Sequence, residues 1–305
     1  MKPAIVVLGS SNTDMVVRLP RLPGPGETIL GGVFSRVPGG KGANQAIAAA
    51  RAGGQVTFIG RVGGDSFGRD AVAALLAEKI DLTYLKSDTG HPSGVALICV
   101  DAHGENAIAV APGANGEVSV QDVECARDAI TKADILVAQF EVPLPSVRAA
   151  AQLAASAGTR FILNPAPALP VDDELLRTVS VLTPNEHEAE VLTGVRITDH
   201  GGVVRAAQAL QARGAGKVII TLGDRGAYVR ENDESAWISA FEVKTVDCTG
   251  AGDVFNGALA VALGEGLALF EAARFASAAA AIAVTRQGAQ TSVPTRSEID
   301  SLLRS

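Results

Sequence analysis

Short apolar runs alternate with longer stretches rich in alanine, leucine and glutamate after residue 110. Continuous apolar strands separated by helices are typical of a parallel sheet with both faces covered. The runs lie at residues 135–137, 161–163, 179–182 and 218–222, and a further run opens the chain at residues 4–8. We therefore predict an α/β fold with an open, mostly parallel sheet and helices on both faces.

Two segments break this pattern and predict a small accessory β-sheet. Residues 15–37 contain three prolines between short β-prone pieces, and residues 93–110 contain two apolar runs around a turn with Gly104 and Asn106. The second segment is typical of a β-hairpin. We expect an α/β core at residues 1–12, 38–92 and 111–305, and a β-sheet lid at residues 13–37 and 93–110 that closes over a substrate.

The composition favours small-molecule chemistry. A formal net charge of -7 and an isoelectric point near 5.2 lack the positive surface of proteins dedicated to nucleic acid or acidic membranes. Three cysteines without a Cys-x-x-Cys pair predict neither a disulfide framework nor a zinc site. No apolar run approaches the roughly 18 residues of a membrane span. We expect a soluble, cytoplasmic protein with neither a nucleic-acid nor a membrane partner.

A glycine-rich turn near the C-terminal end predicts an anion site. Gly250, Ala251 and Gly252 precede Asp253 and an alanine-rich apolar run. Such small residues let a ligand reach the unpaired N–H groups at a helix start. Asp253 then either caps the helix or acts as a general base for an alcohol that attacks a phosphorus or carbonyl centre. This loop alone leaves both interpretations open.

Polar residues follow the predicted strands, at the sheet edge where α/β proteins bind ligands. Asn12 and Asp14 come after the first strand, where they would either bind a polyol or form an Asx turn. Glu141 follows the run that begins at residue 135. The residues after the other runs are Asn164, Asn185 with Glu186, and residues 223–226.

A second glycine-rich turn, residues 39–45, opens another alanine-rich helix. A Walker loop is excluded because Ser35 and Gly42 occupy positions where that motif needs glycine and a hydroxyl residue. The glycines would instead let the backbone approach a sugar, with Lys41 and Asn44 contacting it. A tight turn with a solvated Lys41 is the alternative.

The whole chain resembles the PfkB (ribokinase) family of carbohydrate kinases. The stretches at residues 39–44 and 247–253 match the two family signatures in order and separation. Further matches lie at residues 164–168, 183–186, 221–226 and 278–294. The resemblance implies transfer of the γ-phosphoryl group of ATP to the 5-hydroxyl of D-ribose. Asp253 would be the base, and Gly250, Ala251 and Gly252 would hold the phosphoryl group.

The same resemblance implies the ligand contacts. Ribose would contact Asn12, Asp14, Gly40, Lys41, Gly42, Ala43, Asn44, Glu141 and Asp253. ATP would contact Asn185, Thr221, Leu222, Gly223, Asp224, Arg225, Gly226, Gly252, Asp253 and Ser277. Ser277 is smaller than the ring-bearing residue that some relatives place against adenine, which leaves the choice of phosphate donor open.

Metal ions and a second copy of the chain are also implied. Magnesium would be held by Glu188 through water, although Glu186, Glu188 and Glu190 could equally form a solvated acidic helix face. Potassium would be held by Asp247, Thr249, Ala283, Arg286, Gly288 and Ser292. Family members often pair their lids in a homodimer. The alternative functions are a kinase for a nucleoside, fructose or 2-keto-3-deoxygluconate, and a sugar sensor without catalysis.

Overall fold

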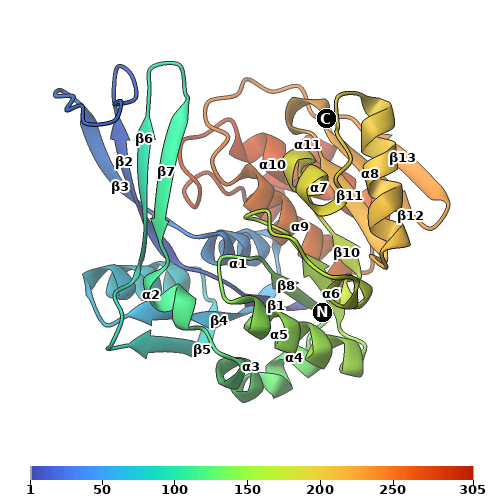
Figure 1. The fold of residues 1–305 in the computed structure, drawn as a ribbon. Helices are drawn as coiled ribbons and strands as arrows, with labels where there is room; N and C mark the ends of the chain where they lie inside the picture. The colour runs from blue at the N-terminus through green and yellow to red at the C-terminus, as the bar shows by residue number, and fades with distance from the viewer. Residues whose placement is uncertain (1, 305) are drawn as a thin grey trace.

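The computed structural model describes residues 2–304, in which nine strands form one sheet and four form another (Figure 1). The large sheet has the order β13-β12-β11-β10-β9-β8-β1-β4-β5, with β1 paired in parallel to β4 and β8. Its strands are β1 (Ala4–Leu8), β4 (Gln55–Gly63), β5 (Asp81–Asp88), β8 (Ile135–Ala138), β9 (Arg160–Leu163), β10 (Val181–Leu182), β11 (Lys217–Thr221), β12 (Ala227–Glu231) and β13 (Glu234–Ile238). The predicted open, mostly parallel sheet is confirmed, with β12 and β13 antiparallel at one edge.

Helices cover both faces of this sheet, and each face has its own apolar core. Side chains of β1 alternate between the two cores: Ile5 and Val7 pack on one side, Val6 and Leu8 on the other. One core is covered by α1 (Lys41–Ala52), α2 (Ser66–Ala77), α9 (Ala251–Gly264), α10 (Leu269–Ala283) and α11 (Arg296–Arg304). The other is covered by α3 (Val120–Cys125), α4 (Arg127–Lys132), α5 (Leu144–Ala157), α6 (Asp173–Thr178), α7 (Glu186–Thr193) and α8 (His200–Ala212).

One strand prediction needs correction, and one hairpin lies where no strand is predicted. The run at residues 179–182 forms a strand only at Val181–Leu182, because Val179 ends α6 and its N–H donates to the carbonyl of Leu176. The hairpin of β12 and β13 was not predicted. Its Trp237 packs against Tyr228 and His200, with ring centroids 4.7 and 4.4 Å apart.

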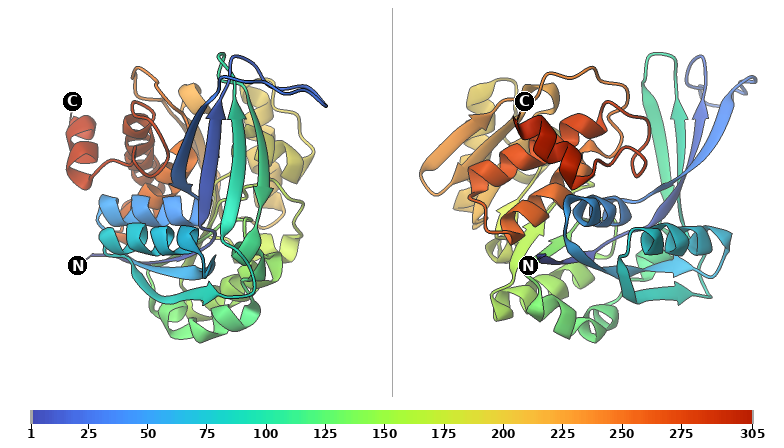
Figure 2. Two further views of the ribbon diagram at one scale, coloured as in Figure 1. Left: turned by 90° about the vertical axis from the view of Figure 1, so that its left-hand side faces the viewer. Right: turned by 180° about the vertical axis from the view of Figure 1, so that it is seen from behind.

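The small sheet projects from the side of the core, as Figure 1 and the right view of Figure 2 show. Its order is β3-β2-β6-β7. The strands are β2 (Asn12–Arg18), β3 (Val33–Gly39), β6 (Gly94–Val100) and β7 (Asn106–Ala111). The expected accessory sheet and its β6–β7 hairpin are confirmed. No helix within residues 2–304 is both long and apolar enough to span a bilayer.

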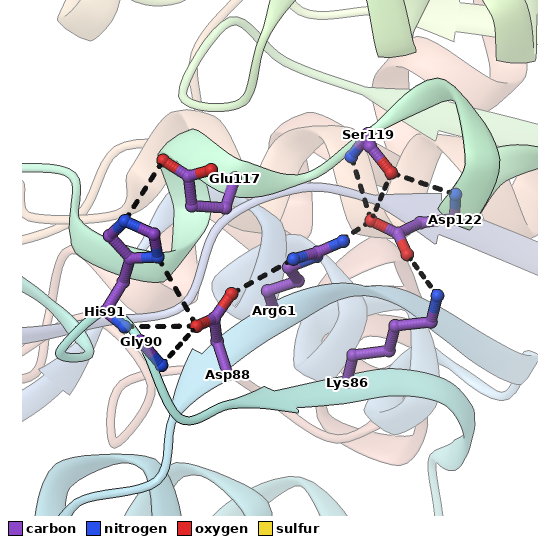
Figure 3. A network of polar contacts seen from close by, with 8 residues as sticks. All are labelled: Arg61, Lys86, Asp88, Gly90, His91, Glu117, Ser119 and Asp122. Carbon is purple, nitrogen blue, oxygen red and sulfur yellow. Dashed lines mark hydrogen bonds and ion pairs between the residues drawn. The ribbon is translucent and has the colours of Figure 1, made fainter.

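A network of charged side chains ties the base of this sheet to the core (Figure 3). Arg61 of β4 donates to Asp88 of β5 over 3.0 Å and to the buried Asp122 of α3 over 2.8 Å. His91 lies between Asp88 and Glu117, which belongs to the 3-10 turn η1 (Gly113–Glu117). The network therefore joins the segment that enters β6 to the turn that follows β7.

Candidate active site

Asp253 lies in the first turn of α9 with a side chain that is almost fully buried. Its Oδ2 accepts a hydrogen bond from Asn44 Nδ2 over 2.9 Å, and its Oδ1 accepts one from Gln45 Nε2 over 3.0 Å. The N-cap of α9 is Gly250, and in the described chain no side chain caps this helix. A side-chain cap by Asp253 is therefore wrong, because its carboxylate faces two amides of α1, while its position in the first turn still lets its charge favour the helix start.

In the loop before Asp253, Gly250 is required by the backbone and the packing, whereas Gly252 has open space beside it. Gly250 has a φ of 76°, and a Cβ there would lie 2.9 Å from the Cβ of Ala289. A Cβ on Gly252 would meet nothing within 4 Å. Ala251 and Gly252 line an open cavity at the start of α9, which is where helices bind anions, and the N–H of Ala251 also donates to the carbonyl of Cys248 over 3.2 Å.

Four carboxylates and one ammonium gather at the carboxyl edge of β1 and β8. Burial and the charges of Glu141 and Asp253 raise the pKa of Asp14 to about 6, although Lys41 opposes this. Burial also raises the pKa of Asp253, against the opposing effect of Lys41. Burial disfavours the charge on Lys41, but Asp253, Glu141, Glu188 and Asp14 outweigh it and raise its pKa. The group carries an excess of negative charge around one cation.

Asn12 and Asp14 lie within β2 rather than in a turn, so the Asx-turn interpretation is wrong. Asn12 Oδ1 accepts a hydrogen bond from Asn115 Nδ2 over 2.7 Å. The Oδ1 of Asn115 in turn accepts one from the N–H of Ser11 over 2.9 Å. Asn115 therefore fixes the amide of Asn12, although 103 positions separate the two in the chain.

The start of α1 packs closely against the loop that follows β1. A Cβ at Gly40 would lie 2.6 Å from the N atom of Asn12, and one at Gly42 would lie 2.5 Å from the N atom of Ser10. The N–H of Ala43 donates to the carbonyl of Ser10 over 2.8 Å. These glycines therefore let one backbone segment approach another, and the expected approach of this backbone to a sugar stays a prediction.

A cavity of about 610 Å³ opens beside the start of α9. It contains most of the residues expected to contact a nucleotide: Thr221, Gly223, Asp224, Arg225, Gly226, Gly252 and Ser277. Leu222, which was also expected to contact a nucleotide, is buried and does not line the cavity. Sequence motifs did not indicate residues 239–243, Thr245 and Phe255, which also line the cavity. The rest of the lining is formed by Cys248, Ala251, Ala280, Ala281 and Val284, which lie in stretches that match the family.

The chain matches the model of the pfkB family of carbohydrate kinases over residues 2–296. The chain belongs to this family. It is 44% identical to the ribokinase of Haemophilus influenzae over 98% of this chain and 97% of that protein. It is 41% identical to the ribokinase of Bacillus subtilis over 98% of this chain and 99% of that protein. The structure of Arabidopsis thaliana ribokinase complexed with ribose and ATP superposes with a TM-score of 0.91, at 34% identity and complete coverage of both chains.

In this pfkB-family chain, Glu188 and Asn185 form a reciprocal cap at the start of α7. The Oε2 of Glu188 accepts from the N–H of Asn185 over 2.8 Å, and the N–H of Glu188 donates to Asn185 Oδ1 over 2.8 Å. Burial raises the pKa of Glu188, while the Asn185 N–H and Lys41 oppose this. Because its side chain is buried, the solvated-face interpretation of Glu188 is wrong.

The residues predicted to hold potassium lie in the loop before α9, at the end of α10 (Ala283) and in the segment that follows α10. Asp247 Oδ1 accepts from the N–H and hydroxyl of Thr249 over 2.9 and 2.6 Å, and its Oδ2 accepts from the N–H of Gly288 over 2.9 Å. Burial works against the charge, but these donors outweigh it and lower the pKa of Asp247. The Arg286 side chain turns toward Glu298 of α11, so only the backbone of Arg286 remains for a cation.

Proposed function

We propose that this chain transfers the γ-phosphoryl group of ATP to the 5-hydroxyl of D-ribose, giving ribose 5-phosphate and ADP. It is an ATP-dependent carbohydrate kinase by family, and ribokinases match it over nearly its full length. One observation carries the mechanism. The buried Asp253 carboxylate accepts hydrogen bonds from Asn44 and Gln45 of α1, and the preceding residue, Gly252, lines the cavity beside the start of α9.

The reaction needs a proton acceptor and a binding site for the transferring group. In our proposal Asp253 takes the proton of the ribose 5-hydroxyl while the sugar oxygen attacks the γ-phosphorus of ATP. The bond between the γ-phosphorus and the oxygen that bridges to the β-phosphate breaks, which releases ADP. The raised pKa of Asp253 makes it a stronger base, and Lys41 and the amides of Asn44 and Gln45 favour its ionised form. The N–H groups at Gly250, Ala251 and Gly252 would bind the phosphoryl oxygens.

Several groups are suited to bind the hydroxyls of ribose. The Oδ1 of Asn44 is buried and has no hydrogen-bond partner among residues 2–304, so it can accept from a hydroxyl. Because Asn115 occupies Asn12 Oδ1, the amide nitrogen of Asn12 remains as a donor. Asp14 and Glu141 add acceptors. A flat apolar ligand would leave these polar groups unsatisfied, so a polyol fits better.

The proposal includes magnesium at Glu188. Asp14, Glu188 and Asp253 all have raised pKa values because they are buried together, and a divalent cation would relieve this excess of negative charge. Oxygen ligands and retained water suit magnesium. Bound there, it would neutralise phosphate oxygens of ATP. Asn185 and Glu188 would hold it on the protein side.

We also propose that potassium orders the loop before α9. Asp247 supplies one carboxylate, and the backbones of Thr249, Ala283, Arg286 and Gly288, with Ser292, would add oxygen ligands. Thr249 immediately precedes the Gly250–Gly252 turn, so a cation here would fix the anion site. We expect higher turnover in potassium than in an equal concentration of tetramethylammonium; equal rates in the two would remove this part of the proposal.

The test of the main proposal is ATP consumption with magnesium and potassium against ribose, deoxyribose, fructose, adenosine, cytidine and 2-keto-3-deoxygluconate. We expect a clear preference for ribose. The Asp253→Asn variant should bind ribose but lose about 100- to 10,000-fold in turnover, as expected for a general base. Preference for another acceptor would overturn the choice of sugar, and binding of ribose without turnover by the unmodified enzyme would support the sensor.

A further inference from the structure

Two fully buried glutamines extend from Asp253 into the core; the mechanism above uses Gln45 only as an amide that favours the ionised carboxylate, and Gln139 not at all. Gln45 lies on α1, which packs beside α9 (Figure 1), and Gln139 directly follows β8. Both are 0% exposed. Gln45 Nε2 donates to Asp253 Oδ1 over 3.0 Å and to Asn164 Oδ1 over 3.1 Å. Gln139 Nε2 donates to Gln45 Oε1 over 2.5 Å.

The second glutamine determines how the first is oriented. An amide oxygen only accepts hydrogen bonds and an amide nitrogen only donates them. Because Gln45 Oε1 is engaged by Gln139, the Nε2 of Gln45 is the end that faces Asp253. The space for Gln139 depends on Gly9, where a Cβ would lie 2.2 Å from Gln139 Oε1. A glycine, two glutamines and the base therefore form one packed series.

We propose that Gln45 is a positioning residue for the base Asp253, and that Gln139 fixes the orientation of Gln45. This inference rests on the proposed function, in which Asp253 receives the sugar proton. Gln45 and Asn44 each hold one carboxylate oxygen, so together they prevent rotation of the carboxylate about its Cβ–Cγ bond. Gln45 is too deeply buried to touch a sugar, and its effect on turnover passes through Asp253.

Replacing Gln45 should change the pKa of Asp253 without moving the charged groups around it. The carboxylate is affected by Lys41 from α1, Glu141 after β8, Glu188 from α7 and Asp14 from β2. Those charges stay in place when Gln45 is replaced. Loss of its N–H donor removes one group that stabilises the ionised carboxylate, so the pKa of Asp253 should rise.

The experiment compares kcat against pH, at saturating ribose and ATP, for the wild type, Gln45→Met and Gln139→Met. For Gln45→Met we expect kcat to fall about 10- to 100-fold and the acidic limb to move up by about one pH unit. The KM for ribose should stay within about threefold, because an interaction with the base acts mainly in the transition state. Gln139→Met should also lower kcat and move the acidic limb to higher pH, in each case by less than Gln45→Met.

The matched control is Ser146→Ala, which removes a buried hydrogen bond from α5 to the carbonyl of Val118 in the opposite core. It should leave the acidic limb unchanged. If Gln45→Met does not fold, Gln45→Glu is the second variant. It keeps the acceptor for Gln139 and adds a negative charge beside Asp253, so the acidic limb of its kcat–pH profile should lie at higher pH than in the wild type, by more than is expected for Gln45→Met. An unshifted limb in both Gln45 variants and Gln139→Met would overturn the inference. Absence of ribose turnover by the wild type would instead contradict the proposed function.

Discussion

At the scale of single residues, the surroundings of Asp14 favour its neutral form more than water does, so they raise its pKa. Its folded-state pKa of about 6 lies above the ordinary value near 4, so between these values the folded protein holds a proton that the unfolded chain releases. Stability therefore falls as pH rises through this window and remains reduced above it. We predict that Asp14→Asn increases the free energy of unfolding at pH 7 by about 3 kcal/mol.

Urea unfolding from pH 4 to pH 8 checks this prediction. The gain should shrink as pH falls from 6 toward 4, because wild-type Asp14 becomes protonated there. Ribose phosphorylation should be lost across the whole range, since asparagine cannot replace the carboxylate acceptor. Asp233→Asn, at an exposed position, should change stability little and is the control. Equal or lower stability of Asp14→Asn at pH 7 would contradict the raised pKa.

The sequence predicted some of these residues because their signal is local. Asp253 follows Gly250 and Gly252 within four positions, so one window contains the turn, the helix start and the acid. Gln45 and Asn115 act through contacts 208 and 103 positions away, which no local pattern can reveal. The glycines of residues 39–42 were recognised, but only the structure supplied the close approach of the backbone at residues 9–12.

At the scale of elements, the start of α9 contains two glycines with different tasks. Gly252→Ala should keep or slightly raise the stability of the helix, because its Cβ meets no protein atom within 4 Å and alanine favours a helix. The same methyl group would occupy the lining of the cavity beside the anion site. We predict that the KM for ATP rises at least about tenfold, given the loss of one or two phosphate contacts.

Gly250→Ala is the matched variant, and here we expect instability instead. A φ of 76° is unfavourable for alanine, and the new Cβ would lie 2.9 Å from that of Ala289. Thermal unfolding and ATP kinetics on both variants separate the two effects. An ATP KM that is unchanged in Gly252→Ala would exclude the phosphate site at this turn.

Element prediction succeeded where a buried strand consists only of apolar residues. Residues 135–137, 161–163 and 218–221 fall in β8, β9 and β11 because both faces of the central sheet are covered, and only Leu222 of the last run lies beyond its strand. The run at residues 179–182 has the same kind of composition, but its first residue, Val179, caps the C-terminal end of α6 and is not in the strand. The β12–β13 hairpin is half exposed and carries mixed polar residues, so its sequence lacks the continuous apolar signal.

At the scale of the whole molecule, the small sheet exposes apolar side chains that a soluble monomer rarely leaves uncovered. Val33, Phe34, Leu97, Ile108 and Val110 are 52–68% exposed, and β3 and β7 are edge strands of the four-stranded sheet. The strand registers place Phe34 and Leu97 on one face of the sheet and Val33, Ile108 and Val110 on the other. Exposed apolar side chains and unpaired edge strands of this kind mark interaction surfaces. We propose that two copies of the chain pair through this sheet, which would bring the two lids into one assembly.

Sedimentation equilibrium on the wild type, Ile108→Lys and Leu76→Lys tests this pairing. The wild type should have twice the 31.1 kDa mass of one chain. Ile108→Lys should sediment as a monomer, because a charge buried at the centre of an apolar interface is left without a partner. Leu76 lies on α2 of the core and is 55% exposed, against 56% for Ile108, so Leu76→Lys controls for the added charge and should remain dimeric. A monomeric wild type at micromolar concentration, or a dimeric Ile108→Lys, would contradict pairing through the sheet; a monomer in the Leu76→Lys variant would place the interface on α2.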